Sequence, residues 1–213
     1  MPHRTIVKIC GITRLADARL AHEAGADWLG MVVLGESPRR VAVEIAREIT
    51  AALDGVVTVA VMVGPTPDQA LELARRTGAA RVQLHRVDTL GWPRDFPIPA
   101  SFAVGVEADG SLREPLPAPE HLVMLDAAHG ALAGGSGRTF PWATARVVSM
   151  TRAVLLAGGL GPDNVADAIA TVRPFGVDAS SRLESAPGVK DEMLVRGFVG
   201  AVRACDAAAE DAP

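Results

Sequence analysis

Short hydrophobic segments alternate with amphipathic segments along nearly the whole chain. Eight segments are mostly apolar and rich in β-branched residues, as buried strands are; they span residues 5–10, 28–34, 56–63, 80–85, 102–106, 121–125, 153–157 and 175–179. Six segments carry apolar residues three or four positions apart and predict helices; they span residues 15–25, 41–53, 67–77, 142–150, 162–172 and 191–205. This alternation predicts a parallel sheet with right-handed crossovers.

Eight such units predict an α/β fold with a single (β/α)8 TIM barrel. An open doubly wound sheet is the alternative, but it usually has about five or six strands. Residues 107–120 are rich in Pro and Gly, so we expect helix five to be short or missing, and helix four to be short. We expect residues 1–205 to form one barrel domain and residues 206–213 to form a frayed C-terminal tail.

Composition narrows the class of protein. The 213 residues are 49% hydrophobic and carry a net charge of about −4, without the basic surface that nucleic-acid binding requires. Any anionic ligand should therefore be small and bound locally. No segment approaches the roughly 20 apolar residues of a membrane span, and the N-terminal apolar run is too short for a signal peptide. With only two cysteines, the expected setting is the reducing cytoplasm, with no nucleic-acid or membrane partner.

The ends of the predicted strands carry the candidate chemistry, because barrel active sites lie at the C-terminal ends of the strands. The loops after strands seven and eight contain Gly158-Gly159 and Ser180-Ser181. A Gly-Gly turn allows close backbone approach, a helix N-terminus favours a phosphate, and this is a frequent phosphate site in barrels. The alternative is that Gly158-Gly159 forms only a tight turn.

Cys10 ends the first predicted strand and is followed by Gly11. Lys8 lies two residues earlier, so its side chain shares the strand face, and its cation should lower the thiol pKa and favour the thiolate. Catalysis is one interpretation of Cys10; a small buried hydrophobic residue is the other. Cys205, in the last predicted helix, is expected to be structural.

Asp126 closes the apolar run of strand six. In a partly dry barrel mouth its carboxyl pKa should rise, which suits a general acid, although a helix cap or loop hydrogen bond would also explain it. Asp178 shares the strand-end position, and we expect a supporting role within the barrel. His85 is a candidate substrate ligand, or a strand-end histidine satisfied by the backbone.

Arg39 and Arg40 follow Pro38 in the loop after strand two. Most arginines are solvated at the surface, but a guanidinium is also a suitable bidentate partner for a substrate carboxylate. The five histidines are scattered, and no Cys/His pair has metal-ligand spacing, so no metal site is predicted.

These residues belong to a series of motifs in which the chain resembles the phosphoribosylanthranilate isomerase family of tryptophan biosynthesis. The motifs follow family order across nearly the whole chain: Lys8-Ile9-Cys10-Gly11-Ile12-Thr13, Gly25-Ala26-Asp27, Ser37-Pro38-Arg39, Val82-Gln83-Leu84-His85, Leu125-Asp126, Gly134-Gly135-Ser136-Gly137, Ala157-Gly158-Gly159-Leu160, and Val177-Asp178-Ala179-Ser180-Ser181 with Pro187-Gly188. The opening motif is highly specific, and the others are strong in combination.

The resemblance implies a TIM-barrel aldose–ketose isomerase that performs an Amadori rearrangement of N-(5′-phosphoribosyl)anthranilate. It implies that Asp126 protonates the ribose ring oxygen and that Cys10, as thiolate, removes the C2′ proton. Arg39 matches the position that faces the anthranilate carboxylate. Gly158, Gly159, Ser180 and Ser181 match the phosphate cradle. No cofactor is expected, because the protonated imine of the substrate serves as electron sink.

Several positions depart from the family pattern. Arg182 and Arg86 stand where the family usually has Gly; a Cβ at residue 182 would disturb the phosphate loop if positive φ were needed, or its guanidinium would add a phosphate contact. Gly161 replaces a usual Asn, Pro141 replaces an Asp, and residues 33–36 lack the usual aromatic. These departures leave Cys10 and Asp126 in place and bear on affinity and specificity.

Two other functions fit parts of the pattern. One is a relaxed or bifunctional sugar-phosphate isomerase similar to the histidine-pathway barrel, whose members typically use two Asp residues and two phosphate loops. The other is a barrel that binds a phosphorylated metabolite without turning it over. The isomerase of the histidine-pathway type is disfavoured because Cys10 stands at the first position and only one phosphate loop is clear. The non-catalytic barrel is disfavoured because both Cys10 and Asp126 are present. Monomer and homodimer are both compatible with the sequence.

Overall fold

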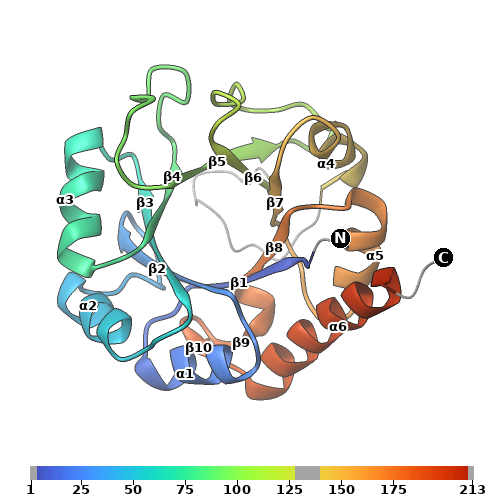
Figure 1. The fold of residues 1–213 in the computed structure, drawn as a ribbon, viewed down its shortest axis with the longest axis horizontal. Coiled ribbons are helices and arrows are strands. Elements are labelled where there is room, and N and C mark those ends of the chain that lie inside the picture. Colours follow the sequence, from blue (N-terminus) through green and yellow to red (C-terminus); the bar gives the residue numbers. More distant parts are fainter. Residues whose placement is uncertain (1–3, 128–139, 211–213) are drawn as a thin grey trace.

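Eight parallel strands close into a barrel with the order β1-β2-β3-β4-β5-β6-β7-β8 (Figure 1). The structure is a computed structural model that describes residues 4–127 and 140–210. The barrel strands are β1 (Ile6–Cys10), β2 (Trp28–Leu34), β3 (Val57–Val63), β4 (Arg81–His85), β5 (Ala100–Val106), β6 (Leu122–Ala127), β7 (Val154–Leu156) and β8 (Gly176–Ala179). The predicted (β/α)8 barrel is confirmed.

Helices surround the barrel in the places that hydrophobic periodicity indicates (Figure 1). They are α1 (Leu15–Glu23), α2 (Val43–Ala51), α3 (Pro67–Thr77), α4 (Trp142–Ser149), α5 (Val165–Val172) and α6 (Glu192–Glu210). The bounds of α3 follow from local chemistry: Thr66 and Gln69 form a reciprocal capping box, and Gly78 ends the helix at φ +70°. Among the described residues, none of these helices has the length and apolar character that crossing a membrane requires.

Two of the seven connections between consecutive barrel strands contain no helix. Residues 86–99 join β4 to β5, and residues 107–121 join β5 to β6, through turns and irregular backbone. The expectation of a short or missing helix five is confirmed, while helix four, expected to be short, is absent. Both segments contain several prolines, which remove the N–H groups that a helix needs.

The C-terminal part differs from the prediction in two ways. After β8 the chain forms a 3₁₀ turn, Ser181–Leu183, and an antiparallel hairpin of β9 (Glu184–Ala186) and β10 (Val189–Lys190), neither of which periodicity indicated. The last helix extends to Glu210, five residues past the predicted boundary at Cys205. Its added turn is held because the Asp206 carboxylate accepts hydrogen bonds from Thr5 N and Arg203.

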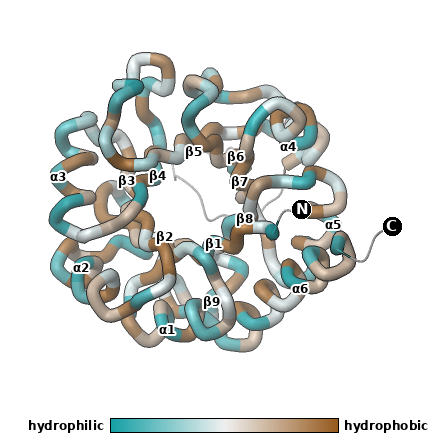
Figure 2. The backbone as a smooth tube through the Cα atoms, in the orientation of Figure 1, coloured by the Kyte–Doolittle hydropathy of each residue, from teal (hydrophilic) through white to brown (hydrophobic). Residues whose placement is uncertain are grey.

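The apolar core has two parts, one between the strands and the helices and one inside the barrel. Figure 2 shows hydrophobic stretches along β2 and β3 and alternating hydrophilic and hydrophobic positions on α2 and α3. Inside the barrel, Trp28, Val59, Val61, Met124 and Leu155 fill the space with apolar atoms. Toward the C-terminal ends of the strands the filling becomes polar, and this change in chemistry marks the site.

Candidate active site

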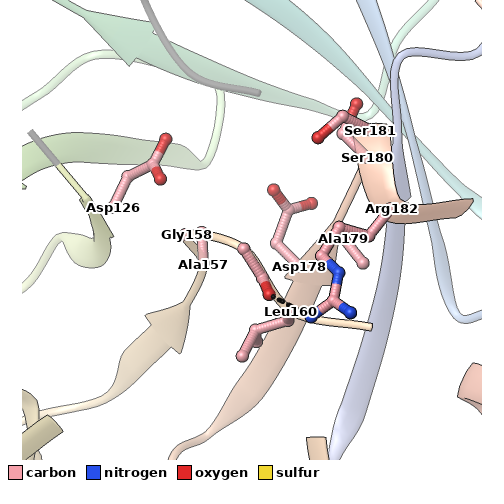
Figure 3. Close-up of a pocket in the computed structure, with 10 residues that line it drawn as sticks. Asp126, Ala157, Gly158, Leu160, Asp178, Ala179, Ser180, Ser181 and Arg182 are labelled. Carbon is pink, nitrogen blue, oxygen red and sulfur yellow. Dashed lines mark hydrogen bonds between the residues drawn. The ribbon is translucent and has the colours of Figure 1, made fainter. Parts of the chain in front are cut away.

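A pocket opens where strands β6, β7 and β8 end (Figure 3). It encloses about 350 Å³, including the part open to solvent. Seven of the predicted site residues line it: Asp126, Gly158, Gly159, Asp178, Ser180, Ser181 and Arg182. The structure therefore brings together the carboxylates and the loops that the strand-end argument selected. Cys10, Arg39 and His85 are not in its wall, but Cys10 connects to it through Lys8 and Arg39 through Glu184 and Lys190.

The Gly158-Gly159 loop has a backbone that only glycine adopts without strain. The two residues have φ of +84° and +66°, and a Cβ on Gly158 would lie 2.7 Å from Ala127 N and 3.2 Å from Asp126 Oδ1. The carbonyl of Gly159 accepts hydrogen bonds from Asn164 Nδ2 at 3.0 Å and from Arg182 Nη1 at 3.1 Å. In a trans peptide the N–H points away from the C=O, so these bonds direct the Leu160 N–H to the opposite side.

Arg182 reaches from the loop after β8 to the loop after β7. Its Nη2 lies 2.7 Å from Asp163 Oδ2, while Nη1 bonds to Gly159 O, the bond drawn in Figure 3. A Cβ on Gly161 would come within 3.2 Å of the Arg182 guanidinium, so the glycine there provides space for it. Arg182 is not among the residues with positive φ, so its Cβ causes no strain. By contrast Arg86, at the other usual Gly position, has φ +54°.

Asp126 lies at the end of β6 with its carboxylate directed into the pocket (Figure 3). Burial raises its pKa to about 7, and the negative charge of Asp178 adds to the rise, while Ala127 N–H and Lys8 oppose it. A carboxyl group with this pKa carries a proton for a substantial part of the time near neutral pH and can donate it. The raised pKa that the sequence argument predicted is confirmed.

This raised pKa has a consequence for stability that Asp126→Asn should reveal. Between pH 4 and 7 the folded protein binds more protons at Asp126 than the unfolded chain does, so the wild-type free energy of unfolding falls as pH rises. Above about pH 7 the full cost of the buried carboxylate is present. We expect Asp126→Asn to match wild type in chemical denaturation at pH 4 and to exceed it increasingly up to pH 8. A constant difference across this range would contradict the pKa assignment.

Cys10 lies inside the barrel beside Lys8, whose ammonium is completely buried. A Cβ on Gly30 would lie 2.8 Å from Cys10 Sγ and 3.0 Å from Lys8 Nζ, so both groups meet over this glycine. Lys8 Nζ donates a hydrogen bond to Asp178 Oδ1 at 2.6 Å, which links the thiol to the wall of the pocket.

Lys8 lowers the thiol pKa of Cys10 as predicted, but the pKa nevertheless lies above its ordinary value. Burial raises this pKa, and its effect exceeds the opposing effect of the Lys8 cation. Asp178 also raises it, and Lys190 lowers it. The sequence correctly placed the cation beside the thiol, but it could not reveal how strongly the barrel excludes water or that Asp178 would bond to the same ammonium.

His85 lies at the end of β4, where Gln83 is its polar neighbour. The Gln83 side-chain amide is 2.9 Å from His85 Nε2, and burial lowers the pKa of His85 to about 4, with Lys8 and Arg86 contributing. The imidazole is therefore neutral at physiological pH. If Gln83 Nε2 donates to His85 Nε2, the ring proton is on Nδ1. Gln83 Oε1 is buried without a hydrogen-bond partner in the described part of the chain.

Arg39 is fixed by an ion pair that sequence analysis did not identify. Its Nε and Nη2 donate to the Glu184 carboxylate at 2.8–3.0 Å, and Lys190 Nζ lies 2.7 Å from the same carboxylate. Lys190 Nζ also donates to Ser180 O at 3.2 Å. This cluster connects Arg39 to the Ser180 loop through the hairpin. Pro187-Gly188 was the signal in the sequence for a turn, and such a turn would bring Glu184 and Lys190 opposite each other.

Gly11, the residue after Cys10 in the opening motif, gives space to Arg39 and Ser180. Gly11 has φ +75°, and a Cβ there would lie 2.6 Å from Arg39 Cδ and 2.8 Å from Ser180 Oγ. The absence of a side chain at Gly11 thus lets Arg39 and Ser180 approach the end of β1. Among residues 4–127 and 140–210, no group of three or more His, Cys, Asp or Glu side chains is arranged to hold a metal ion. Residues 134–137, the Gly-rich motif before α4, lie outside the described residues.

Comparison with known proteins agrees with this geometry. The family model for N-(5′-phosphoribosyl)anthranilate (PRA) isomerase matches residues 7–201. An N-(5′-phosphoribosyl)anthranilate isomerase of Rubrobacter xylanophilus is 43% identical over 202 residues, covering 92% of this chain and 98% of the relative.

Solved structures are similar along the whole barrel. One form of the dimeric isomerase from Thermotoga maritima, crystallised as monomers, superposes with a TM-score of 0.80 at 33% identity, covering 94% of this chain and 99% of that chain. A phosphoribosyl anthranilate isomerase in complex with reduced 1-(o-carboxyphenylamino)-1-deoxyribulose 5-phosphate has a TM-score of 0.77 at 32% identity, with the same coverage. On these matches, and on the site described above, the chain belongs to the N-(5′-phosphoribosyl)anthranilate isomerase family.

Proposed function

We propose that this protein isomerises N-(5′-phosphoribosyl)anthranilate to 1-(o-carboxyphenylamino)-1-deoxyribulose 5-phosphate in tryptophan biosynthesis. The observation that carries the proposal is Asp126, a carboxyl group with a pKa of about 7, in one pocket with the Gly158-Gly159 and Ser180-Ser181 loops. Membership of the isomerase family, and the product-like ligand bound to the relative of known structure, support it.

The reaction needs one proton donor and one base. Asp126 donates its proton to the ribose ring oxygen as the C1′–O bond breaks, which leaves a protonated imine between C1′ and the anthranilate nitrogen. The Cys10 thiolate then takes the proton from C2′, and the electron pair of that C–H bond forms an enolamine. Tautomerisation moves a proton from the C2′ hydroxyl to C1′ and gives the ketose. Lys8, held by Asp178, stabilises the thiolate at the moment it is needed.

Binding roles follow from the same geometry. The backbone N–H groups of the Gly158-Gly159 loop, the start of α5 and the two hydroxyls of Ser180 and Ser181 form the cradle proposed for the phosphate. Arg39, oriented by Glu184, is the proposed partner of the anthranilate carboxylate. His85 is neutral and suits a hydrogen bond to the sugar, and Asp178 orients Lys8 beside the substrate.

Arg182 supports the phosphate cradle by positioning the loop, and Arg182→Gln tests this role. Loss of the hydrogen bond to Gly159 O should release the peptide that carries the Leu160 N–H. A hydrogen bond of about 0.5–1.5 kcal/mol corresponds to roughly a two- to tenfold change in binding. We expect KM for the substrate and Kd for inorganic phosphate to rise together by that factor, with kcat nearly unchanged.

Arg182→Lys and a distant variant complete this test. Lysine keeps the charge but does not present the fork that bridges Gly159 O and Asp163, so it should rescue binding only in part. Arg47→Gln, on the exposed side of α2, should leave KM and phosphate binding unchanged. A fall in kcat with unchanged KM for Arg182→Gln would exclude a role in the phosphate cradle.

The activity itself is tested by the loss of fluorescence of freshly made phosphoribosylanthranilate on adding the protein. Turnover of this substrate with little turnover of the histidine-pathway aminoaldose supports the proposal. Comparable turnover of both substrates would favour the relaxed or bifunctional isomerase. Phosphate binding without turnover of either would leave only the non-catalytic barrel.

We further propose that the protein acts in the cytoplasm as a single-domain barrel that includes α6 up to Glu210, and as a monomer or homodimer. Support for a homodimer comes from the Thermotoga maritima relative, which is described as dimeric. Its proposed partner is its small phosphorylated substrate, with no nucleic acid or membrane as partner. Light scattering during size-exclusion chromatography distinguishes the two oligomeric states.

A further inference from the structure

A second cavity lies at the opposite end of the barrel from the active site. Residues at or just before the N-terminal ends of β2, β4, β5, β6, β7 and β8 form its wall. Its volume is about 460 Å³, and ligand cavities usually measure about 300–1,000 Å³. This cavity is separate from the pocket at the C-terminal ends of the strands, because the two share no lining residue.

Arg81, the first residue of β4, is the main polar group of this cavity. Its guanidinium carbon lies 4.5 Å from the centre of a Trp28 ring, and its Nε is buried with no hydrogen-bond partner in the described part of the chain. Burial lowers the pKa of Arg81, and no carboxylate among residues 4–127 and 140–210 counteracts this effect. Contact with Trp28 offsets part of the desolvation, but buried charges in proteins are normally paired.

The other polar groups at this end do not neutralise Arg81. Glu120 lies 3.9 Å from Arg94, and the negative charge of Glu120 acts on His121 and Arg152. His121 also lines the cavity; burial lowers its pKa, and its Nε2 is buried without a partner among residues 4–127 and 140–210. The cavity therefore presents one partly desolvated cation and one unsatisfied imidazole nitrogen.

Apart from Arg94 and Glu120, most of the remaining wall is apolar. Phe175 is 6.1 Å from Trp28 between ring centroids, and Phe96, Ile98 and Leu122 continue the apolar surface. We propose that this cavity is a second binding site, distinct from the active site, for a small aromatic carboxylate whose anionic group pairs with Arg81 and whose ring lies against the aromatic wall. A guanidinium and a carboxylate form bidentate, charge-assisted hydrogen bonds, which here would use the Nη groups of Arg81 and neutralise its charge.

The probe for this site is 2-naphthoate, with 2-naphthamide as a neutral molecule of the same shape. Isothermal titration calorimetry with the full chain in a phosphate-free buffer should detect naphthoate and show at least about tenfold weaker binding of the amide. Arg81→Gln should weaken naphthoate binding by a similar factor, and Arg47→Gln, an exposed arginine outside the cavity, should not change it. A crystal soaked in naphthoate should place the ring beside Trp28.

A second variant keeps the test independent of the folding of Arg81→Gln. Ala153 is exposed and lines the cavity, so Ala153→Trp should fill the cavity and abolish binding while Arg81 remains. Saturating inorganic phosphate occupies the active site and should leave naphthoate binding unchanged. Displacement by phosphate, equal binding of acid and amide, unchanged binding in Ala153→Trp, or no binding at millimolar probe would each overturn the proposal. None of these outcomes bears on isomerase activity, which is measured separately.

Discussion

Asp126→Asn should lower kcat/KM for phosphoribosylanthranilate by at least about 10²-fold, the usual scale for loss of a general acid. The asparagine amide keeps the size of the side chain but cannot give a proton to the ribose ring oxygen. The measurement is the initial rate of substrate fluorescence loss at several concentrations. Asp54→Asn, an exposed carboxylate in the loop before β3, is the matched control and should retain wild-type rates.

Phosphate binding distinguishes loss of chemistry from loss of structure in this variant. Because Asp126 is not part of the proposed cradle, Asp126→Asn should bind inorganic phosphate with nearly wild-type affinity. The free energy of unfolding of Asp126→Asn at pH 8 should exceed that of wild type, because the asparagine does not carry the buried charge that raises the carboxyl pKa. A variant with full activity would remove Asp126 from the mechanism and with it the observation on which the proposed function depends.

Cys10→Ala should also lose at least about 10²-fold in kcat/KM, because no other base then removes the C2′ proton. Cys10→Ser retains a hydroxyl group of similar shape but with a much higher pKa, so it should be nearly as inactive. The matched control is Cys205→Ser, in α6, which should keep its activity. Activity of Cys10→Ala close to that of wild type would reject the thiol as base.

The pH dependence assigns the two roles separately. The proposed mechanism requires Cys10 as thiolate and Asp126 as acid, yet the pKa of Asp126 is about 7 and the thiol pKa lies above its ordinary value. Wild-type kcat/KM should therefore rise with pH up to about 7, form a plateau, and fall only at the higher thiol pKa. Between the two pKa values, Cys10 and Asp126 together hold one proton, which is mostly on Cys10. The active form, with the proton on Asp126 and Cys10 as thiolate, is the less populated of the two.

Each variant should lose one limb of this profile. Residual activity of Asp126→Asn should rise with pH up to the thiol pKa, because thiolate alone then limits the rate. Residual activity of Cys10→Ser should be constant below about pH 7 and fall above it, following the Asp126 proton. The opposite assignment of limbs would exchange the roles of acid and base between the two residues.

Much of the barrel and of its site was predictable because strand ends are marked in the sequence. Buried parallel strands are continuous apolar runs, and the residue that interrupts such a run, as Asp126 does, lies at a rim. All strands from β1 to β8 were located, and Asp126, Asp178 and the two phosphate-loop motifs were placed at one end of the barrel. Strand edges shifted by a residue or two, so that Asp126 lies within β6 instead of after it.

What the sequence did not predict depends on contacts between distant segments. The hairpin after β8 is too short for periodicity, and the Glu184 partner of Arg39 lies 145 residues further along the chain. Arg182 was expected near phosphate, but only the structure shows its bonds to Gly159 and Asp163. The direction of the Cys10 pKa shift depended on the balance between burial and one cation, which residue order does not determine.

The ion pair between Lys8 and Asp178 joins the first barrel strand to the last, across 170 residues. Cys10, the proposed base, and the neighbouring Lys8 are translated first, whereas Asp178, the counter-ion of Lys8, is translated near the end of synthesis. Until β8 has left the ribosome, the nascent chain contains the Cys10 thiol and the Lys8 ammonium, but Asp178 cannot yet pair with Lys8. Appearance of enzymatic turnover during refolding or translation would therefore report closure of the cylinder itself, later than formation of any single helix.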